Sequence, residues 1–191
     1  MNNTAAAESY TQSHAVSAAT LHSTGQYLTF MLGGEAYAIG ILAIKEIIEH
    51  GQMTRVPMMP EAIRGVINLR GAVVPVIDLG VRFRHGPTAI TKRTCIVIVE
   101  VEREGEAEVV GILVDAVNEV MDIAAADIEP APTFGTRIHT EFIAGMARIK
   151  DHFVIILEPD RVLSVEEMTE LVTETAAAND APVEELTQMA A

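Results

Sequence analysis

The residues with the most potential for chemistry in this sequence are six histidines and one cysteine. No two histidines lie three or four positions apart, and no carboxylates accompany them at the spacing of metal ligands. Cys95 lies in the apolar run 94–99, where a thiol stays protonated and unreactive. Because both residue types lack the neighbours that a metal site or a nucleophile needs, we predict no catalytic residue, no metal site and no cofactor.

Motifs for phosphate binding and acyl transfer are also missing from the sequence. Gly33 and Gly34 stand alone between two apolar runs and do not form a phosphate-binding loop. No Gly-x-Ser-x-Gly nucleophile elbow occurs. The segment 139–141 offers a histidine, a threonine and a glutamate, but no nucleophile accompanies it. The sequence therefore favours a binding protein, and its elements are expected to position binding surfaces.

The length and hydropathy of the chain indicate a small folded protein. With 191 residues and 49% hydrophobic content, it suits one compact domain or two small ones that share an interface. No apolar stretch approaches the roughly 18 residues of a membrane span, and the N-terminus lacks the pattern of a signal peptide. We therefore expect a cytoplasmic protein without direct membrane insertion.

The net charge of the chain limits the classes of partner that it is expected to bind. The chain carries −14, divided into +2 over residues 1–99 and −16 over residues 100–191. Proteins that bind nucleic acid need a basic face, and an acidic surface is repelled by anionic lipid. Neither class of partner is expected. Solubility is the favoured cause of the acidic excess. The alternatives are that the two halves face different partners, or that one half meets a basic partner.

Short apolar runs separated by turn residues predict a mainly β fold. Gly33, Gly34 and Glu35 form a hairpin signal between two such runs. Pro75 interrupts another run, which predicts an edge or bulged strand. The predicted strands cover residues 27–32, 37–41, 73–77, 95–101, 109–114 and 153–157.

A weak internal repeat indicates a duplicated β unit. Residues 65–78 match residues 145–158 at a constant offset, and residues 40–47 match residues 111–120 after a short insertion. Two copies of one small unit predict two barrels side by side. The predicted sub-barrels cover about 26–90 and 91–163, with the boundary near 85–93 and with exchange of a strand left open.

One helix and two flexible tails complete the predicted organisation. Ser164 and Glu167 form a capping box. The residues Val165, Met168, Leu171 and Val172 then share one helical face. A C-terminal helix is predicted over about 165–176, with flexible tails over 1–25 and 177–191.

Several segments, in order, resemble the CheW family of chemotaxis coupling proteins over residues 26–172. The segments that carry the resemblance are 27–42, 44–47, 65–71, 73–79, 111–120 and 142–145. The resemblance implies two tandem SH3-like five-stranded β-barrels. It also implies a non-catalytic adaptor that couples methyl-accepting receptors to the histidine kinase CheA in signalling arrays. The same module occurs in CheA and CheV, but this chain has no room for their kinase or receiver domains, which favours a free-standing adaptor.

The resemblance assigns a charged pair and its neighbours to a protein interface. Glu46 and Arg70 occupy the positions of a pair that these proteins place at the receptor and kinase interface. Ile44 and Ile47 flank Glu46 and belong to the same predicted interface. Taken alone, the charged residues would be assigned to solvent and the isoleucines to the core. Ala43 departs from the polar residue common at this position, which leaves partner selectivity open.

The remaining predicted interface residues are Gly65, Asn68, Gly71, Cys95 and Ile96. The two glycines bracket the turn that contains Asn68, and tight backbone turns are their first role. Cys95 and Ile96 begin the second repeat and belong to the predicted interface as residues that border the groove between barrels, although core packing is the favoured interpretation for both.

The expected partners are the regulatory domain of CheA and the cytoplasmic tip of methyl-accepting receptors. The protein is expected to be a monomer alone, to form rings or arrays with its partners, and to reach membrane receptor clusters through them. An adaptor of a non-flagellar chemosensory pathway is an alternative. A ligand-binding β-barrel and an enzyme with a nonlocal site are alternatives from other classes.

Overall fold

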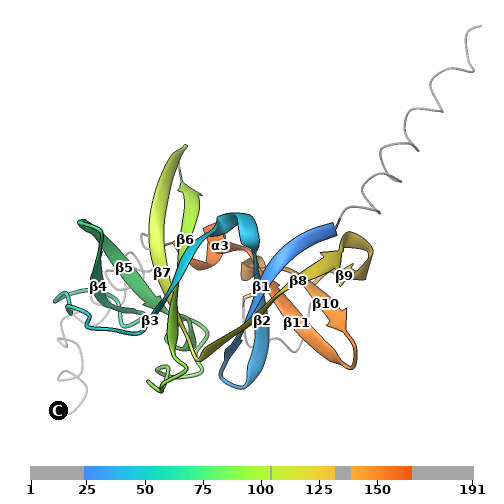
Figure 1. Cartoon of the computed structure of the whole chain (residues 1–191), viewed down its shortest axis with the longest axis horizontal. Helices are drawn as coiled ribbons and strands as arrows, with labels where there is room; N and C mark the ends of the chain where they lie inside the picture. Colours follow the sequence, from blue (N-terminus) through green and yellow to red (C-terminus); the bar gives the residue numbers. More distant parts are fainter. Residues whose placement is uncertain (1–23, 104, 132–138, 165–191) are drawn as a thin grey trace, which may run out of the picture.

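The computed structural model describes residues 24–103, 105–131 and 139–164, and these form two β-sheets that lie side by side (Figure 1). The elements in chain order are β1 (Thr24–Leu32), β2 (Glu35–Gly40), η1 (Ile41–Ala43), β3 (Ile44–Glu49), β4 (Ile63–Leu69), β5 (Ala72–Asp78), α2 (Leu79–Arg82), β6 (Cys95–Arg103), β7 (Glu106–Val114), β8 (Ala116–Ala124), η2 (Ala125–Asp127), β9 (Ile128–Glu129), η3 (Thr140–Phe142), β10 (Ile143–Ile149), β11 (His152–Leu157) and α3 (Pro159–Val162). The η elements are single 3₁₀ turns. The predicted β class is confirmed.

The predicted first hairpin is confirmed, and its turn follows from two glycines. Gly33 and Gly34 have φ angles of 59° and 87°, and two consecutive positive φ angles match the twist of the flanking strands. β1 begins at Thr24, so the last two residues of the predicted N-terminal tail belong to this strand. Residues 1–23, the predicted helix 165–176 and the predicted tail 177–191 lie outside the described residues.

The two sheets are the two SH3-like barrels, and the chain crosses between them twice. The first barrel has the strand order β3-β6-β7-β5-β4, and the second has the order β8-β1-β2-β11-β10-β9. The crossings are η1, between β2 and β3, and Asp115, between β7 and β8. Asp115 is tied to the β1–β2 hairpin, because its N–H donates to Met31 O (3.0 Å) and its carboxylate accepts from Gly33 N (2.8 Å).

The barrels therefore do not divide the chain at residues 90 and 91 as predicted. The first barrel is the continuous stretch 44–114, and the second combines the N-terminal hairpin with β8–β11. The expected boundary at 85–93 is a loop inside the first barrel, between α2 and β6. The prediction followed the sequence repeat, but the leading hairpin of each repeat pairs with strands of the other repeat.

The repeat itself is visible in the fold. The segment β4-β5-α2, which begins at Ile63, recurs as β10-β11-α3, which begins at Ile143. The hairpin turns at Arg70 and Lys150 share positive φ angles of 52° and 55°. The second barrel has six strands because β9 pairs with β10 over two residues, a position that a single Thr54–Val66 bridge occupies in the first barrel.

The proline-interrupted strand β5 differs from the prediction of an edge or bulged strand. It lies between β4 and β7 in the sheet. Pro75 is tolerated because the parallel pairing with β7 begins only at Val76, so no strand on that side needs its missing N–H. The irregularity in pairing lies in the partner strand, between Ile63 and Gly65.

Three apolar clusters hold the structure together, and the largest lies between the barrels. We call this cluster the inter-barrel core. Phe30 and Tyr37 of the N-terminal hairpin stack at 6.0 Å, and Tyr37 stacks on Phe83 of the first barrel at 5.7 Å. Phe83 in turn lies 6.4 Å from Phe142. Burial, with a smaller contribution from Glu35, raises the pKa of Tyr37 above its ordinary range, so the phenol stays neutral and donates to Glu35 Oε2 at 3.1 Å.

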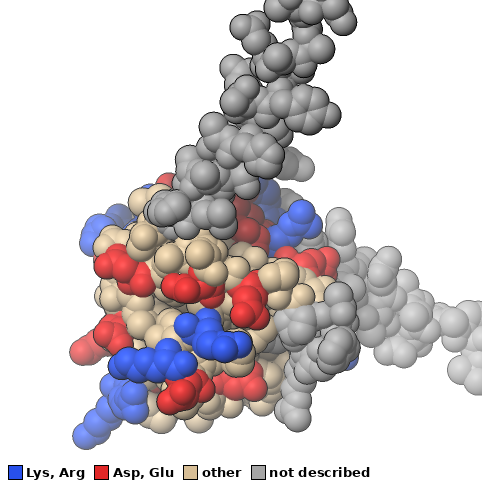
Figure 2. Space-filling view, turned by 90° about the vertical axis from the view of Figure 1, so that its right-hand side faces the viewer, with Lys and Arg blue, Asp and Glu red and all other residues tan. Residues whose placement is uncertain are grey.

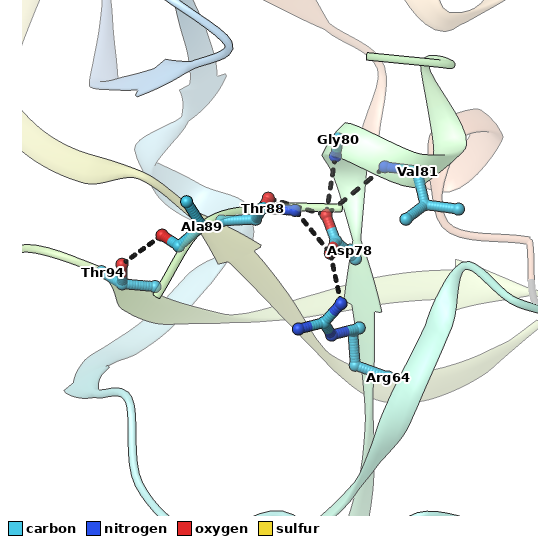
Figure 3. Close-up of polar contacts among 7 residues, drawn as sticks. All are labelled: Arg64, Asp78, Gly80, Val81, Thr88, Ala89 and Thr94. Carbon is cyan, nitrogen blue, oxygen red and sulfur yellow. Dashed lines mark hydrogen bonds and ion pairs between the residues drawn. The ribbon is translucent and has the colours of Figure 1, made fainter. Parts of the chain in front are cut away.

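Asp78 anchors the connection between α2 and β6 (Figure 3). Its fully buried carboxylate caps α2 by accepting from Gly80 N at 2.9 Å. It also accepts from Thr88 N at 3.0 Å and from Thr88 Oγ1 at 2.7 Å, and it lies 3.5 Å from Arg64 Nη1. The repeat places Glu158 at the equivalent position before α3, where the side chain makes no capping hydrogen bond.

Asp78→Asn should destabilise the protein by about 2–4 kcal/mol, because the amide group cannot accept from every donor that faces the carboxylate. Glu158→Gln is the matched control and should change the free energy of unfolding by less than about 0.5 kcal/mol. Urea unfolding followed by circular dichroism measures both. Equal effects of the two substitutions would contradict the anchoring role.

The exchanged hairpins predict the behaviour of fragments divided at the expected boundary. Residues 1–88 and 89–191 each lack strands of both barrels, so neither fragment alone should unfold cooperatively. A mixture of the two should recover the strand content and the cooperative transition of the intact chain, as measured by circular dichroism. Cooperative unfolding of either isolated fragment would refute this interpretation of the topology.

Candidate protein-interaction site

The strand β3 presents alternating side chains at one edge of the first barrel. Lys45, Ile47 and Glu49 point outward, and Ile47 remains 43% exposed. Ile44 faces inward and packs against the inter-barrel core. The register with β6 shifts between Ile44 and Glu46. An edge strand with an exposed apolar residue between two charged ones is a suitable surface for another protein.

Glu46 and Arg70 are brought together as the resemblance implies. Arg70 Nη2 donates to Glu46 Oε2 at 2.9 Å, with side-chain exposures of 79% for Arg70 and 25% for Glu46. Glu46 lies on one edge strand of the barrel, and Arg70 lies in the turn that leads out of the opposite edge strand. The pair therefore bridges the two edges. Such an exposed pair contributes only about 0–1 kcal/mol to the stability of the fold. Its charges are therefore better explained by recognition of a partner.

A shallow hollow lies beside this ion pair. Its volume is about 450 Å³, and its lining combines the charged pair with apolar side chains of the barrel. Val74 and Leu69, which line it, belong to the core of the first barrel or pack against it. The hollow therefore offers a partner both charge and apolar surface.

The turn that carries Arg70 is fixed by its neighbours. Asn68 Oδ1 accepts a hydrogen bond from Gly71 N at 2.8 Å. Gly71 has a φ of 93°, a conformation that glycine adopts without steric cost. Asn68 and Gly71 are therefore positioning residues for Arg70 in addition to being exposed themselves.

Gly65 acts through backbone packing. A Cβ atom at this position would lie 2.5 Å from Thr54 O. The close approach allows the backbones of Thr54 and Val66 to exchange hydrogen bonds of 2.9 and 2.8 Å. Gly65 is buried, so it lies beneath the predicted interaction surface and is not exposed on it.

Cys95 and Ile96 lie deeper than an interface requires. Ile96 is 1% exposed and belongs to the core of the first barrel. Cys95 is half-buried against the inter-barrel core, and its thiol donates to Arg93 O at 3.2 Å. Both pair with β3, opposite Ile48 and Glu49. The structure places these residues behind the surface of β3.

A larger groove lies between the barrels, where the sequence analysis expected one, but Cys95 and Ile96 are not among its lining residues. We call it the inter-barrel groove. It has a volume of about 920 Å³ and is lined by residues of both barrels and of η1. Leu42 on η1 lines it and is 99% exposed. The groove also holds four carboxylates, from Glu100, Glu102, Glu158 and Asp160. Glu100 is ion-paired with Lys45, which joins the groove to the surface of β3.

Other chemistry is sparse in the part of the chain that the structure describes. Within residues 24–103, 105–131 and 139–164, no three His, Cys, Asp or Glu side chains gather as metal ligands would. His139 and Glu141 lie 3.9 Å apart, and both are largely exposed. Among the same residues, no helix has the length and apolar character to cross a membrane.

Two fused SH3-like barrels with exposed charged and apolar surfaces define a scaffold for protein–protein contacts. The family model of the CheW-like domain matches residues 26–167. The chain belongs to the CheW family, whose members are non-catalytic chemotaxis coupling adaptors.

Individual relatives support this assignment. The chemotaxis protein CheW of Klebsiella aerogenes is 37% identical over 143 residues, which cover 75% of this chain and 84% of the relative. The CheW protein of Bacillus subtilis is 35% identical over 150 residues, which cover 78% and 93%. The crystal structure of the scaffolding protein TtCheW from Thermoanaerobacter tengcongensis matches with a TM-score of 0.67 and 37% identity, over 75% of this chain and 90% of that one.

Gly65→Ala should destabilise the first barrel by about 2–4 kcal/mol, because the added methyl group overlaps the Thr54 carbonyl. Gly40→Ala is the matched control, since nothing lies within 4 Å of the added atom. That control should leave the urea unfolding midpoint within experimental error or raise it slightly. A Gly65→Ala variant as stable as Gly40→Ala would show that the close approach is not required.

Proposed function

We propose that this protein joins the cytoplasmic tip of methyl-accepting chemotaxis receptors to the regulatory domain of the histidine kinase CheA. It acts in the cytoplasm and reaches the membrane through receptor clusters. The observation that carries the proposal is the exposed Glu46–Arg70 pair on the edge of a barrel, beside Ile47 and an apolar hollow. The function requires no turnover, only contacts with two partners at once.

We assign the receptor to the inter-barrel groove and the edge strand beside it. Receptor tips present helical hairpins, and a helix binds by placing its apolar face in a groove. The inter-barrel groove supplies Ile41 and Leu42 for such a face, and Lys45 connects it to the edge strand that carries Glu46. Ile44, Ile47 and Glu46 are the residues proposed to contact or support this partner.

CheA is assigned to the barrel ends. Phe153 is 49% exposed in the second barrel, where the Arg148 guanidinium lies 5.3 Å from its ring. In the sequence repeat, Val73 of the first barrel corresponds to Phe153 of the second. Val73 is 72% exposed and lies near the turn of Arg70. Figure 2 views the molecule from the side of the second barrel and shows acidic and basic side chains interspersed there.

Two such ends can support an extended assembly. The CheA regulatory domain belongs to the same family, so each module has two barrel ends. Contacts between unlike ends are heterologous and close into rings when the rotation permits. Single contacts are expected to be weak, and receptors that link many of them supply avidity. The protein alone should therefore be monomeric at micromolar concentration.

The barrel interiors argue against a ligand-binding β-barrel. The first is filled by the side chains of a core cluster that includes Ile67, Val76 and Leu113, and the second by one that includes Ile123 and Ile156. Filled interiors leave no space for a small molecule. An adaptor of a non-flagellar pathway would use the same surfaces.

Glu46→Lys and Arg70→Glu should each weaken binding to receptor and CheA at least tenfold while changing stability by less than about 1 kcal/mol. The assay is co-sedimentation with receptor-containing membrane vesicles and CheA. Glu106→Lys, an exposed charge reversal at the β6–β7 turn, is the matched control and should bind normally.

The double variant Glu46→Arg with Arg70→Glu separates recognition from barrel closure. It restores an ion pair between the two edges but reverses the charges that a partner meets. Binding should remain lost although thermal unfolding is normal. Normal binding by the double variant, or by both single variants, would defeat the assignment of this pair to the interface.

A further inference from the structure

The last described residues of the chain are held by the first barrel, although they follow the second in sequence. Arg103, at the end of β6, donates to Ser164 Oγ at 3.0 Å. Arg82 of α2 donates through Nε to Val162 O at 3.3 Å, and its guanidinium lies 4.7 Å from the Phe142 ring. Residues 165–191 therefore leave the described structure next to α2 and β6 of the first barrel.

Contacts through α2 and the buried Asp78 link this exit to a face that combines arginines with apolar side chains. α2 begins at the Asp78 carboxylate, which contacts Arg64 at 3.5 Å. Arg55, Arg64 and Glu61 line a hollow of about 160 Å³ together with apolar side chains. The apolar lining residues are Val56, Met59, Pro60 and Ile63. We call this face, the loop 55–64 with its hollow, the arginine–methionine face.

Apolar side chains of this face are open to solvent in the described structure. Met58 is 95% exposed with a φ of 64°, a conformation that is uncommon for a residue with a side chain of this size. Val56 is 39% exposed. Met59 is half-buried and packs against the inter-barrel core. The loop carries Arg55 and Arg64 against Glu61, and this net positive charge beside adjacent apolar residues favours an occupant that is both apolar and acidic.

The segment 165–191 has that composition. It holds seven acidic residues and no Lys or Arg. Its first twelve residues place Val165, Met168, Leu171 and Val172 on one helical face, with Glu166, Glu167, Glu170 and Glu174 among them. A twelve-residue helix spans about 18 Å, which suits a segment that crosses one small barrel.

We propose that residues 165–176 fold back over the first barrel and dock on the arginine–methionine face of the same chain. The apolar residues Met168, Leu171 and Val172 cover Val56 and Met59, and the glutamates meet Arg55 and Arg64. The inter-barrel groove is a larger hollow, but its four carboxylates repel an acidic segment. The inference concerns the isolated protein and does not depend on the proposed partners.

A spin label tests the docking in the full chain. Cys95→Ala removes the single cysteine, and Thr173→Cys then carries a nitroxide on the C-terminal segment. Amide signals of the loop 55–64 and of α2 should broaden in the NMR spectrum, and those of Leu42 and Gly105 in the groove should stay sharp. Broadening in the groove, or none beyond residues 160–164, would overturn the proposal.

A mixture identifies whether the occupant is a second copy. Spin-labelled protein at natural isotope abundance is mixed with ¹⁵N-enriched protein that carries no spin label. The enriched signals should remain unaffected if docking is within one chain. Broadening of the loop 55–64 in this mixture would assign the face to contacts between copies and would contradict the proposal.

Charge reversal supplies the specificity control. Arg55→Glu in the labelled chain should reduce the broadening of the loop 55–64 at least threefold, and Lys92→Glu, a reversal at another exposed cation, should leave it unchanged. Raising the salt concentration should also reduce the broadening, since screened charges attract less. Equal spectra for both variants would show that charge does not select this face.

Discussion

The pairing of the N-terminal hairpin with β8 and β11 is the constraint on which the rest of the structure depends. It obliges the chain to leave the second barrel at η1 and to return to it at Asp115. Both links are too short to let the barrels separate. The stacked rings of Phe30, Tyr37 and Phe83 then fill the space between the sheets. The barrels share one core, so the molecule is a single cooperative unit with two binding faces.

The interaction surfaces follow from the same constraint. β3 begins directly after the first crossing, which makes it an edge strand with Glu46 within reach of the turn at Arg70. The crossing η1 also carries Leu42 to the mouth of the inter-barrel groove. The Lys45–Glu100 ion pair lies between these two surfaces. A partner that binds η1 therefore contacts an element that leads directly into β3, the strand that carries Glu46.

Local signals in the sequence predicted local structure well. The glycine pair at 33–34 located the first hairpin, the repeat located two equivalent barrels, and the resemblance paired Glu46 with Arg70. The division at residue 90 was wrong because a repeat shows that two hairpins are alike but not which strands each will join. The depth of Ile96 depends on strands of the first barrel that are distant in sequence, and the groove around Leu42 depends on strands of both barrels. Such surfaces leave no periodic pattern in the sequence.

The exchange of hairpins also sets an order of events during synthesis. Gly40 ends the first hairpin, but its neighbour β11 ends only at Leu157. At about 5–20 residues per second, the ribosome completes β11 roughly 6–23 s after β2. The strands of the first barrel, residues 44–114, are all made within that interval. Until β8 (Ala116–Ala124) has also been made, the nascent hairpin has no second-barrel partner for Leu28 and Phe30, and this is a period in which a chaperone has an apolar strand pair to bind.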